Sequence, residues 1–235
     1  MIPYRKQIIF VVVSIVICVA LIVSIFFQAR RGALREMNER QKIYAALAAK
    51  GIGSVLDQNL AVLQALSQSN RVIRMEEDGK TVLQAALQGS GKYVQGITRV
   101  NRHGKIVYTF PTVPGAVGTD ISGQPHIREA LQTKKPVVSD IFDALQGFRT
   151  MAVHVPVFRG KTFDGTVGFL IAFSDLAKEY LNNLYIPGSR YALLVNSRGK
   201  IIHCINPAHS GRPALAYFQN DFEAAVMVRD MISGK

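Results

Sequence analysis

The first pattern along the chain is a continuous apolar segment. The 20 positions from Ile8 to Phe27 carry no charged side chain. A helix of this length is about 30 Å long, which matches the hydrocarbon core of a bilayer. The segment is longer than the apolar region of a cleaved signal peptide, and no small-residue cleavage pattern follows it. It therefore predicts an uncleaved transmembrane anchor, with residues 1–29 as tail and span.

A long helix is predicted directly after the anchor, from Arg30 to Ser67. Gly51 and Gly53 are expected to weaken it in the middle. Such a helix suits a mechanical connector between a domain and the bilayer, although it would serve equally well as packing support. One mostly apolar face recurs at helical spacing, formed by Ala48, Ile52, Val55, Asn59, Leu63 and Leu66.

Beyond residue 90 the pattern changes to short strands separated by turn residues. The predicted extended segments are Tyr93–Val100, Lys105–Phe110, Pro136–Ile141, Gly147–Phe158 and Gly165–Phe173. The predicted helices are Thr81–Leu87, Pro125–Gln132, Leu176–Leu184 and Asp221–Ile232. Pro187 and Gly188 are expected to end the third of these helices. This order of elements predicts an α+β fold with an antiparallel sheet.

An internal repeat is the most informative feature of this part. Residues 100–107 read VNRHGKIV, and residues 195–202 read VNSRGKII, at an offset of 95. Each copy predicts strand, tight turn, strand. The second copy is followed by a loop and one helix, without the two closing strands that the first copy has. We therefore expect an incomplete second module, in a chain that stops early.

Charge and cysteine content narrow the function classes. After the anchor, 26 basic and 16 acidic residues leave a net charge of +10, which favours anionic ligands or lipid headgroups or is simply a solvated basic surface. No nucleic-acid-binding pattern or metal motif is present. Cys18 lies in the apolar segment, far from Cys204, so no disulfide framework is predicted. Basic residues flank both sides of the anchor and leave its orientation open.

Several short segments, taken in order, resemble one family of sensor regions. They are TDIS at 119–122, EAL at 129–131, KPVVSD at 135–140, GFR at 147–149, HVPVF at 154–158, GTVG at 165–168, NPAHSG at 206–211 and MISGK at 231–235. Together they are similar to the double-Cache, PAS-like sensor regions of bacterial transmembrane receptors. The resemblance covers nearly everything beyond the anchor.

The resemblance implies an arrangement and a function. It implies an extracytoplasmic sensor at the inner membrane, with a histidine kinase, diguanylate cyclase or chemoreceptor rod as a missing output. The expected partners are a small-molecule ligand, the membrane and a second copy through the long helix. No cofactor and no nucleic acid are expected. The expected regions are 1–29, tail and anchor; 30–67, connector helix; 68–185, membrane-distal Cache module; and 186–235, partial membrane-proximal module.

The family pocket lies in the first module, between the sheet and the loop–helix segment that joins its second and third strands. Arginine suits a carboxylate, which favours a small organic anion as ligand. The amino-acid-binding subgroup typically carries Arg-x-Trp-Tyr, whereas this chain has no tryptophan, which argues against amino-acid binding. The candidate ligand-binding residues are Tyr108, His126, Arg128, Asp140, Phe142, Arg149, Met151 and Phe169.

Catalysis within these residues is not expected, because no nucleophile elbow, phosphate loop or metal-ligand motif is present. Two other functions stay open beside the sensor. One is a membrane-tethered binding or scaffold protein without signalling output. The other is a domain that pairs with another receptor chain along the long helix.

Overall fold

The computed structural model describes residues 4–182, 193–196, 198–204 and 206–233. The chain divides into two units, 1–47 and 48–235, which we describe separately. Helix α1 (Tyr4–Gln68) continues through both, so the predicted span and connector are one helix of 65 residues. Among the described residues, α1 is the one helix apolar enough and long enough to cross a membrane.

Helix α1 continues through Gly51, and this glycine makes room for another helix. A Cβ atom at this position would lie 2.2 Å from Cε1 of Tyr180, which belongs to α5 (Phe173–Asn182). The missing side chain therefore lets the aromatic ring of α5 pack directly on the backbone of α1. The same part of α1 buries Ile52 and Leu63, as the helical spacing predicts.

The six-stranded antiparallel sheet has the strand order β2-β1-β6-β5-β3, with β4 paired to β5 beside this path. The strands are β1 (Val94–Asn101), β2 (Ile106–Phe110), β3 (Val137–Val138), β4 (Phe142–Asp143), β5 (Arg149–Arg159) and β6 (Thr162–Ile171). The prediction of an α+β fold built on an antiparallel sheet is confirmed. Phe173, predicted as the end of the last strand, instead begins α5, so β6 stops two residues earlier.

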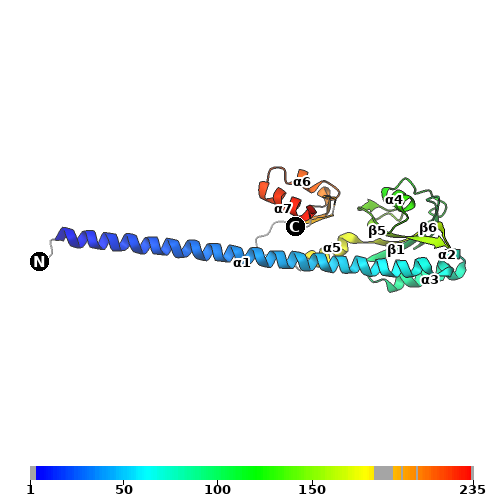
Figure 1. Cartoon of the computed structure of the whole chain (residues 1–235), viewed down its shortest axis with the longest axis horizontal. Coiled ribbons are helices and arrows are strands. Elements are labelled where there is room, and N and C mark those ends of the chain that lie inside the picture. Colours follow the sequence, from blue (N-terminus) through cyan, green and yellow to red (C-terminus); the bar gives the residue numbers. More distant parts are fainter. Residues whose placement is uncertain (1–3, 183–192, 197, 205, 234–235) are drawn as a thin grey trace. The chain divides into compact units, whose positions relative to one another are not determined.

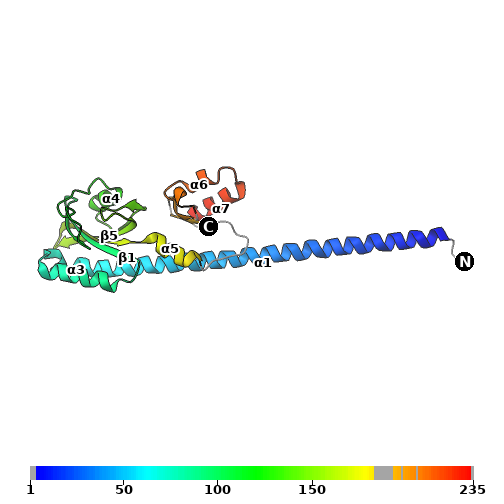
Figure 2. The same cartoon turned by 180° about the vertical axis from the view of Figure 1, so that it is seen from behind.

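Each face of this sheet has its own cover. One face packs against four helical segments and forms the main hydrophobic core with them. These are the C-terminal part of α1, α2 (Asn70–Arg74), α3 (Glu77–Gly89) and α5. Helix α4 (Pro125–Thr133) lies on the other side of the sheet (Figure 1), and the view from behind shows the same order (Figure 2). Pro125 stands in the first turn of α4, as predicted. Proline suits this position because a backbone N–H in the first turn has no partner within the helix.

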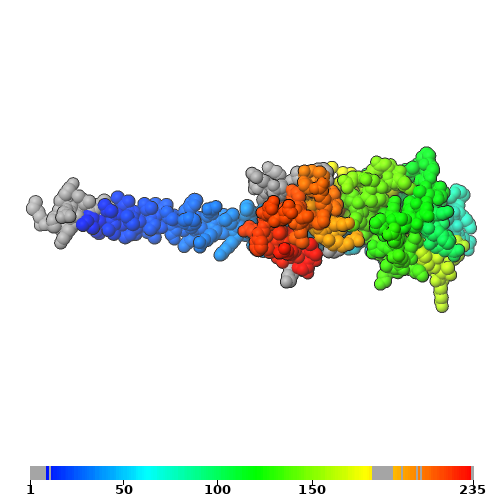
Figure 3. Space-filling view, turned by 90° about the horizontal axis from the view of Figure 1, so that it is seen from above, coloured from blue at the N-terminus to red at the C-terminus, as the bar shows by residue number. Residues whose placement is uncertain are grey.

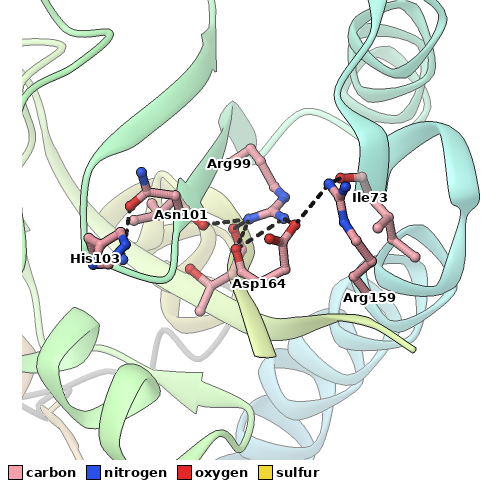
Figure 4. A network of polar contacts seen from close by, with 8 residues as sticks. Ile73, Arg99, Asn101, His103, Arg159 and Asp164 are labelled. Atoms are coloured by element: carbon pink, nitrogen blue, oxygen red, sulfur yellow. Dashed lines mark hydrogen bonds and ion pairs between the residues drawn. The ribbon is translucent and has the colours of Figure 1, made fainter. Parts of the chain in front are cut away.

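A buried arginine connects the sheet to the helical cover. Arg99 on β1 is 2% exposed, and its guanidinium lies 2.9 Å from the carboxylate of Asp164 on β6. Arg159 on β5 lies 3.7 Å from the same carboxylate and donates a hydrogen bond to the carbonyl of Ile73 on α2 (Figure 4). The network thus joins three strands to the helices on the core side.

The predicted repeat is confirmed bond by bond. Asn101 Oδ1 accepts the backbone N–H groups of His103 and Lys105, and Asn196 Oδ1 accepts those of Arg198 and Lys200. Backbone bonds to the loop that follows also correspond, Ile106 to Thr119 in the first copy and Ile201 to Arg212 in the second. The two hairpins therefore share the same hydrogen bonds in their turns, as expected for two copies of one repeat.

The second copy forms a small structure of its own. In the described part its sheet consists of β7 (Leu193–Val195) and β8 (Ile201–Cys204). The 3₁₀ turn Pro207–His209, α6 (Ala214–Tyr217) and α7 (Phe222–Ser233) follow, and a separate small core joins Ile201, Ala214 and Val228. Leu184, Pro187, Gly188 and the predicted module boundary at 185–186 lie outside the described residues.

Candidate functional site

The sheet presents a polar surface to α4, because side chains alternate along each strand. On β5, Met151, Val153 and Val155 belong to the main core, whereas Ala152 and His154 point to the opposite side. That opposite side is covered by α4 and by the segment that includes β4. Seen from above, the covering part of the chain belongs to the green surface of the space-filling view (Figure 3).

A small cavity of about 30 Å³ lies between the sheet and this cover. Its volume is roughly that of one water molecule in the liquid. Polar side chains come from the strands, from α4 and from the covering segment. The lining residues are Thr98, Ile106, Ile121, Gln124, His126, Phe142, Ala144, Leu145, Gln146, His154 and Leu170.

Two buried histidines from different elements meet in this cavity. His126 on α4 and His154 on β5 have ring centroids 5.5 Å apart, and the other side of His126 packs on Phe142 at 4.6 Å. Nδ1 of His154 lies 3.2 Å from Oγ1 of Thr166, which orients the ring on the sheet. The pair therefore joins the cover to the sheet through an imidazole on each side.

Gly168 creates the space that His154 occupies. The two residues are register partners on β6 and β5, and a Cβ atom at Gly168 would lie 2.5 Å from Nδ1 of His154. No real Cβ contact is that short, so an added methyl group has to displace the imidazole. The absence of a side chain at Gly168 is therefore required for His154 to adopt its position on the neighbouring strand.

Burial keeps both imidazoles uncharged at neutral pH. It lowers the pKa of His126 to about 4. It lowers the pKa of His154 to about 3, and the neighbouring His126 adds to this shift. A neutral imidazole carries one N–H donor and one nitrogen acceptor. The pair therefore has hydrogen-bonding capacity without charge.

Amide and hydroxyl groups complete the polar lining. Gln146 donates a hydrogen bond of 3.1 Å to Oγ1 of Thr109, and that oxygen lies 3.3 Å from Oγ1 of Thr98. Thr98 and Thr109 are register partners on β1 and β2. The chain of groups runs from the covering segment to the edge of the sheet, so the covering segment and the sheet are joined by hydrogen bonds on this side also.

The structure brings two of the predicted site residues together. His126 and Phe142 line the cavity, in contact with each other. Tyr108, Met151 and Phe169 lie instead in the core between the sheet and the helices, on the opposite face. These three residues lie on strands that border the cavity. Because side chains alternate along a strand, however, theirs point to the other side of the sheet.

The three predicted charged residues lie outside the cavity lining. Arg128 is exposed on α4 and donates to the carbonyl of Gly123. Arg149 is exposed, with Nε 3.7 Å from the carboxylate of Asp143. The carboxylate of Asp140 accepts hydrogen bonds from the repeat hairpin, with Asn196 at 2.8 Å and Lys200 at 3.0 Å. Each has a partner elsewhere than the cavity.

Four polar lining residues were missed by the sequence analysis: Thr98, Gln124, Gln146 and His154. His154 had a usable signal, because it is the one polar side chain among Val153, Val155 and Val157 on a buried strand. Buried polar groups in such a position need a partner, which points to a site. The two glutamines lie in irregular segments and had no such signal.

The comparisons with known proteins identify the family of this part of the chain. Residues 46–172, more than half of the chain, match the family described as HK/GC/chemotaxis protein-like, sensor domain. The matched range contains the sheet, α2, α3, α4 and every residue that lines the cavity, and it ends just before α5. No functionally curated protein matches the sequence.

Solved structures share the fold. An extracellular ligand-binding receptor from Desulfohalobium retbaense has a TM-score of 0.67 at 20% identity, covering 83% of this chain and 34% of its own. The ligand-binding domain of the Pseudomonas aeruginosa chemoreceptor PctB with L-Gln has 0.63 at 16% identity, with coverages of 77% and 74%. That of Pseudomonas fluorescens CtaA with L-serine has 0.59 at 18%, with 77% and 81%. The chain spans about a third of the first protein, and identities this low show the fold alone.

Proposed function

We propose, since the chain belongs to the HK/GC/chemotaxis protein-like sensor domain family, that it is the ligand-sensing region of a membrane signal-transduction receptor. The observation that carries this proposal is the cavity with its histidine pair. A few converging polar groups in an otherwise apolar hollow are typical of small-molecule sites. These residues bind a ligand and leave it chemically unchanged, and signalling chemistry belongs to an output domain.

The geometry supports a mechanical route from ligand to helix. A ligand in the cavity contacts α4 and the covering segment on one side and the strands on the other. The reverse face of those strands packs on Ile52, Leu63 and Leu66 of α1 in one core. A ligand that prefers one spacing of cover and sheet thus shifts the population of α1 positions. A ligand with equal affinity for both states would transmit nothing.

The N-terminal part of α1 is the membrane anchor in this proposal, and the sensor lies on the extracytoplasmic side of the inner membrane. The side chains of Phe10, Ile22 and Phe26 are more than 60% exposed. Exposed apolar surface of this extent around a helix suits lipid, since lipid tails remove it from water.

A second copy of the chain is the proposed partner of the segment after the anchor. Leu34, Met37, Tyr44 and Leu47 of α1 are exposed, and the first three have the 3-then-7 spacing of a coiled-coil seam. We expect Tyr44→Cys, in a chain with Cys18 and Cys204 changed to Ser, to form a disulfide-linked dimer under mild oxidation. Glu39→Cys, on the outer side of such a seam, is the matched control. Equal crosslinking of both variants would argue against a specific seam.

Ligand binding is expected to raise the melting temperature of the detergent-solubilised full chain at pH 7.5. A ligand at a hundred times its Kd stabilises by about 2.7 kcal/mol. For a domain of this size that is about 5–10 °C. In a thermal screen of small metabolites, Gln146→Leu should remove the shift because it removes an amide from the lining. Arg128→Ala, exposed on α4, should retain it.

The opposite pattern would contradict the cavity as the site. If Arg128→Ala or Arg149→Ala removed the shift and Gln146→Leu retained it, the ligand would bind at the exposed arginines instead. A flat response of the wild type across a broad panel, with the protein folded, would argue against a small-molecule sensor.

A further inference from the structure

The lining of the cavity points to the class of ligand, and this inference rests on the proposed sensor function. We infer that the ligand is a small uncharged molecule with hydrogen-bond donors and acceptors, such as an amide or a polyol. Among the described residues, no Asp, Glu, Lys or Arg side chain lines the cavity. The polar lining consists of imidazole, amide and hydroxyl groups.

These groups can satisfy a neutral polar ligand completely. Imidazole, carboxamide and hydroxyl groups each offer both donor and acceptor capacity when uncharged. The groups come from both walls: His126 and Gln124 from the α4 side, Gln146 from the covering segment, and Thr98 and His154 from the strands. A ligand carbonyl and a ligand N–H or O–H can therefore find opposite partners across the hollow.

An anion would meet an unfavourable site. The nearest candidates for a positive charge in the lining are the two imidazoles. His126, with a pKa of about 4, would have to take up a proton at pH 7. Three pH units make this proton uptake about a thousandfold unfavourable, about 4 kcal/mol at 1.36 kcal/mol per unit, before the attraction between imidazolium and anion offsets a part of it. Leaving the carboxylate unpaired in a buried cavity is no better, because an isolated buried charge is costly.

A cation or a zwitterion meets the same difficulty. No carboxylate in the described lining could pair with a positive group of the ligand. Asp140, two residues before Phe142, is bonded to Asn196 and Lys200. A free amino acid carries both charges at neutral pH. Our sequence-based expectation of an organic anion depended on the net charge of +10 and on arginine side chains. Arg128 and Arg149 are exposed and bonded elsewhere.

The size of the cavity adds a structural requirement. A volume of about 30 Å³ is small beside the roughly 300–1,000 Å³ of typical ligand sites, so we expect the cover to move when the ligand enters. Strand β4 is joined to β5 by only two register pairs, Phe142 with Thr150 and Asp143 with Arg149. The segment that includes β4 can therefore separate from β5 at a small cost in backbone hydrogen bonds.

Acetamide and acetate are a matched pair of probes, similar in size and shape and different in charge. The chain has five histidines, so selectively labelled imidazoles can be followed by NMR in the detergent-solubilised full chain at pH 7. Single variants His126→Gln and His154→Gln assign the two signals. We expect acetamide to perturb both signals saturably and acetate to bind more weakly, by up to about a thousandfold. The perturbation should be lost in Gly168→Ala, which displaces His154, and weakened at least tenfold in Gln146→Leu.

The outcomes separate this inference from the sensor function. Acetate binding as tightly as acetamide, with both imidazole signals shifted, would overturn the uncharged-ligand inference and leave the cavity as the site of a sensor. If neither probe shifted either imidazole while the two signals reported a folded protein, the cavity would be inaccessible to small molecules, and the proposed function would fall with the inference. Retained binding in Gln146→Leu, with Arg128→Ala as the matched surface control, would place the probe outside the cavity.

Discussion

Replacing Asp164 by alanine is expected to destabilise the sensor by about 3–5 kcal/mol, because it leaves the charge of Arg99 buried without a carboxylate to balance it. Arg99 is 2% exposed and its guanidinium donates to the carbonyls of Val100, Asp164 and Thr166 as well as to the Asp164 carboxylate (Figure 4). Burial lowers the pKa of Arg99, and the carboxylate of Asp164 acts in the opposite direction. Urea unfolding of the detergent-solubilised chain, followed by circular dichroism, measures the loss.

Two further variants separate a buried charge from a general loss of contacts. Asp143→Ala removes an exposed carboxylate that lies 3.7 Å from the exposed Arg149, and exposed pairs contribute about 0–1 kcal/mol. The double variant Arg99→Met with Asp164→Ala removes both charges and should recover much of the stability lost in Asp164→Ala. A loss below 1 kcal/mol for Asp164→Ala would mean that water reaches the guanidinium, contrary to its burial.

Acidification is expected to destabilise the folded protein between about pH 6.5 and pH 4, through the histidine pair. Both imidazoles titrate near 6.5 in the unfolded chain, whereas their folded pKa values are about 4 and about 3. Below pH 6.5 the unfolded chain therefore binds protons that the folded chain does not, and stability rises with pH in this window. At 1.36 kcal/mol per unit, each histidine accounts for about 3 kcal/mol by pH 4.

The pH effect is measured as the difference in unfolding free energy between pH 7 and pH 4.5. His126→Gln and His154→Gln should each flatten the profile, even where they change the stability at pH 7. His103→Gln, at an exposed turn position, should leave the slope unchanged. A slope as steep in the double variant His126→Gln and His154→Gln as in the wild type would show that other groups, such as the carboxylates, control acid unfolding.

The strands and their turns follow from local chemistry, which explains why the sequence predicts them well. Val94–Asn101 and Ile106–Phe110 lie within a residue or two of the expected segments, because an Asn and a Gly at defined positions specify the turn. The same chemistry predicted the second hairpin, 95 residues later. α2 was not predicted, since five residues are too short for helical periodicity to be recognised.

The site was only partly predictable, because its residues come from separate elements. His126 and Phe142 were among the sequence candidates and line the cavity, which lies in the part of the module where the resemblance implied a pocket. The charged candidates Arg128 and Arg149 have the right chemistry for an anion but lie outside the cavity lining. The role of Gly168 could not be predicted from the sequence, because it depends on the pairing of two strands that places His154 next to this glycine.

The sequence by itself determined the apolar segment, the long helix, the succession of the main strands along the chain and the repeated hairpin, because each depends on local periodicity or turn chemistry. The tertiary structure decided which face of the sheet became core and which became cavity. Alternation gives two faces but does not say which one the helices cover, and only the packing of α1, α2, α3 and α5 places Tyr108, Met151 and Phe169 inside. The neutral state of the two imidazoles is a tertiary property also, since it comes from burial that separate segments create together.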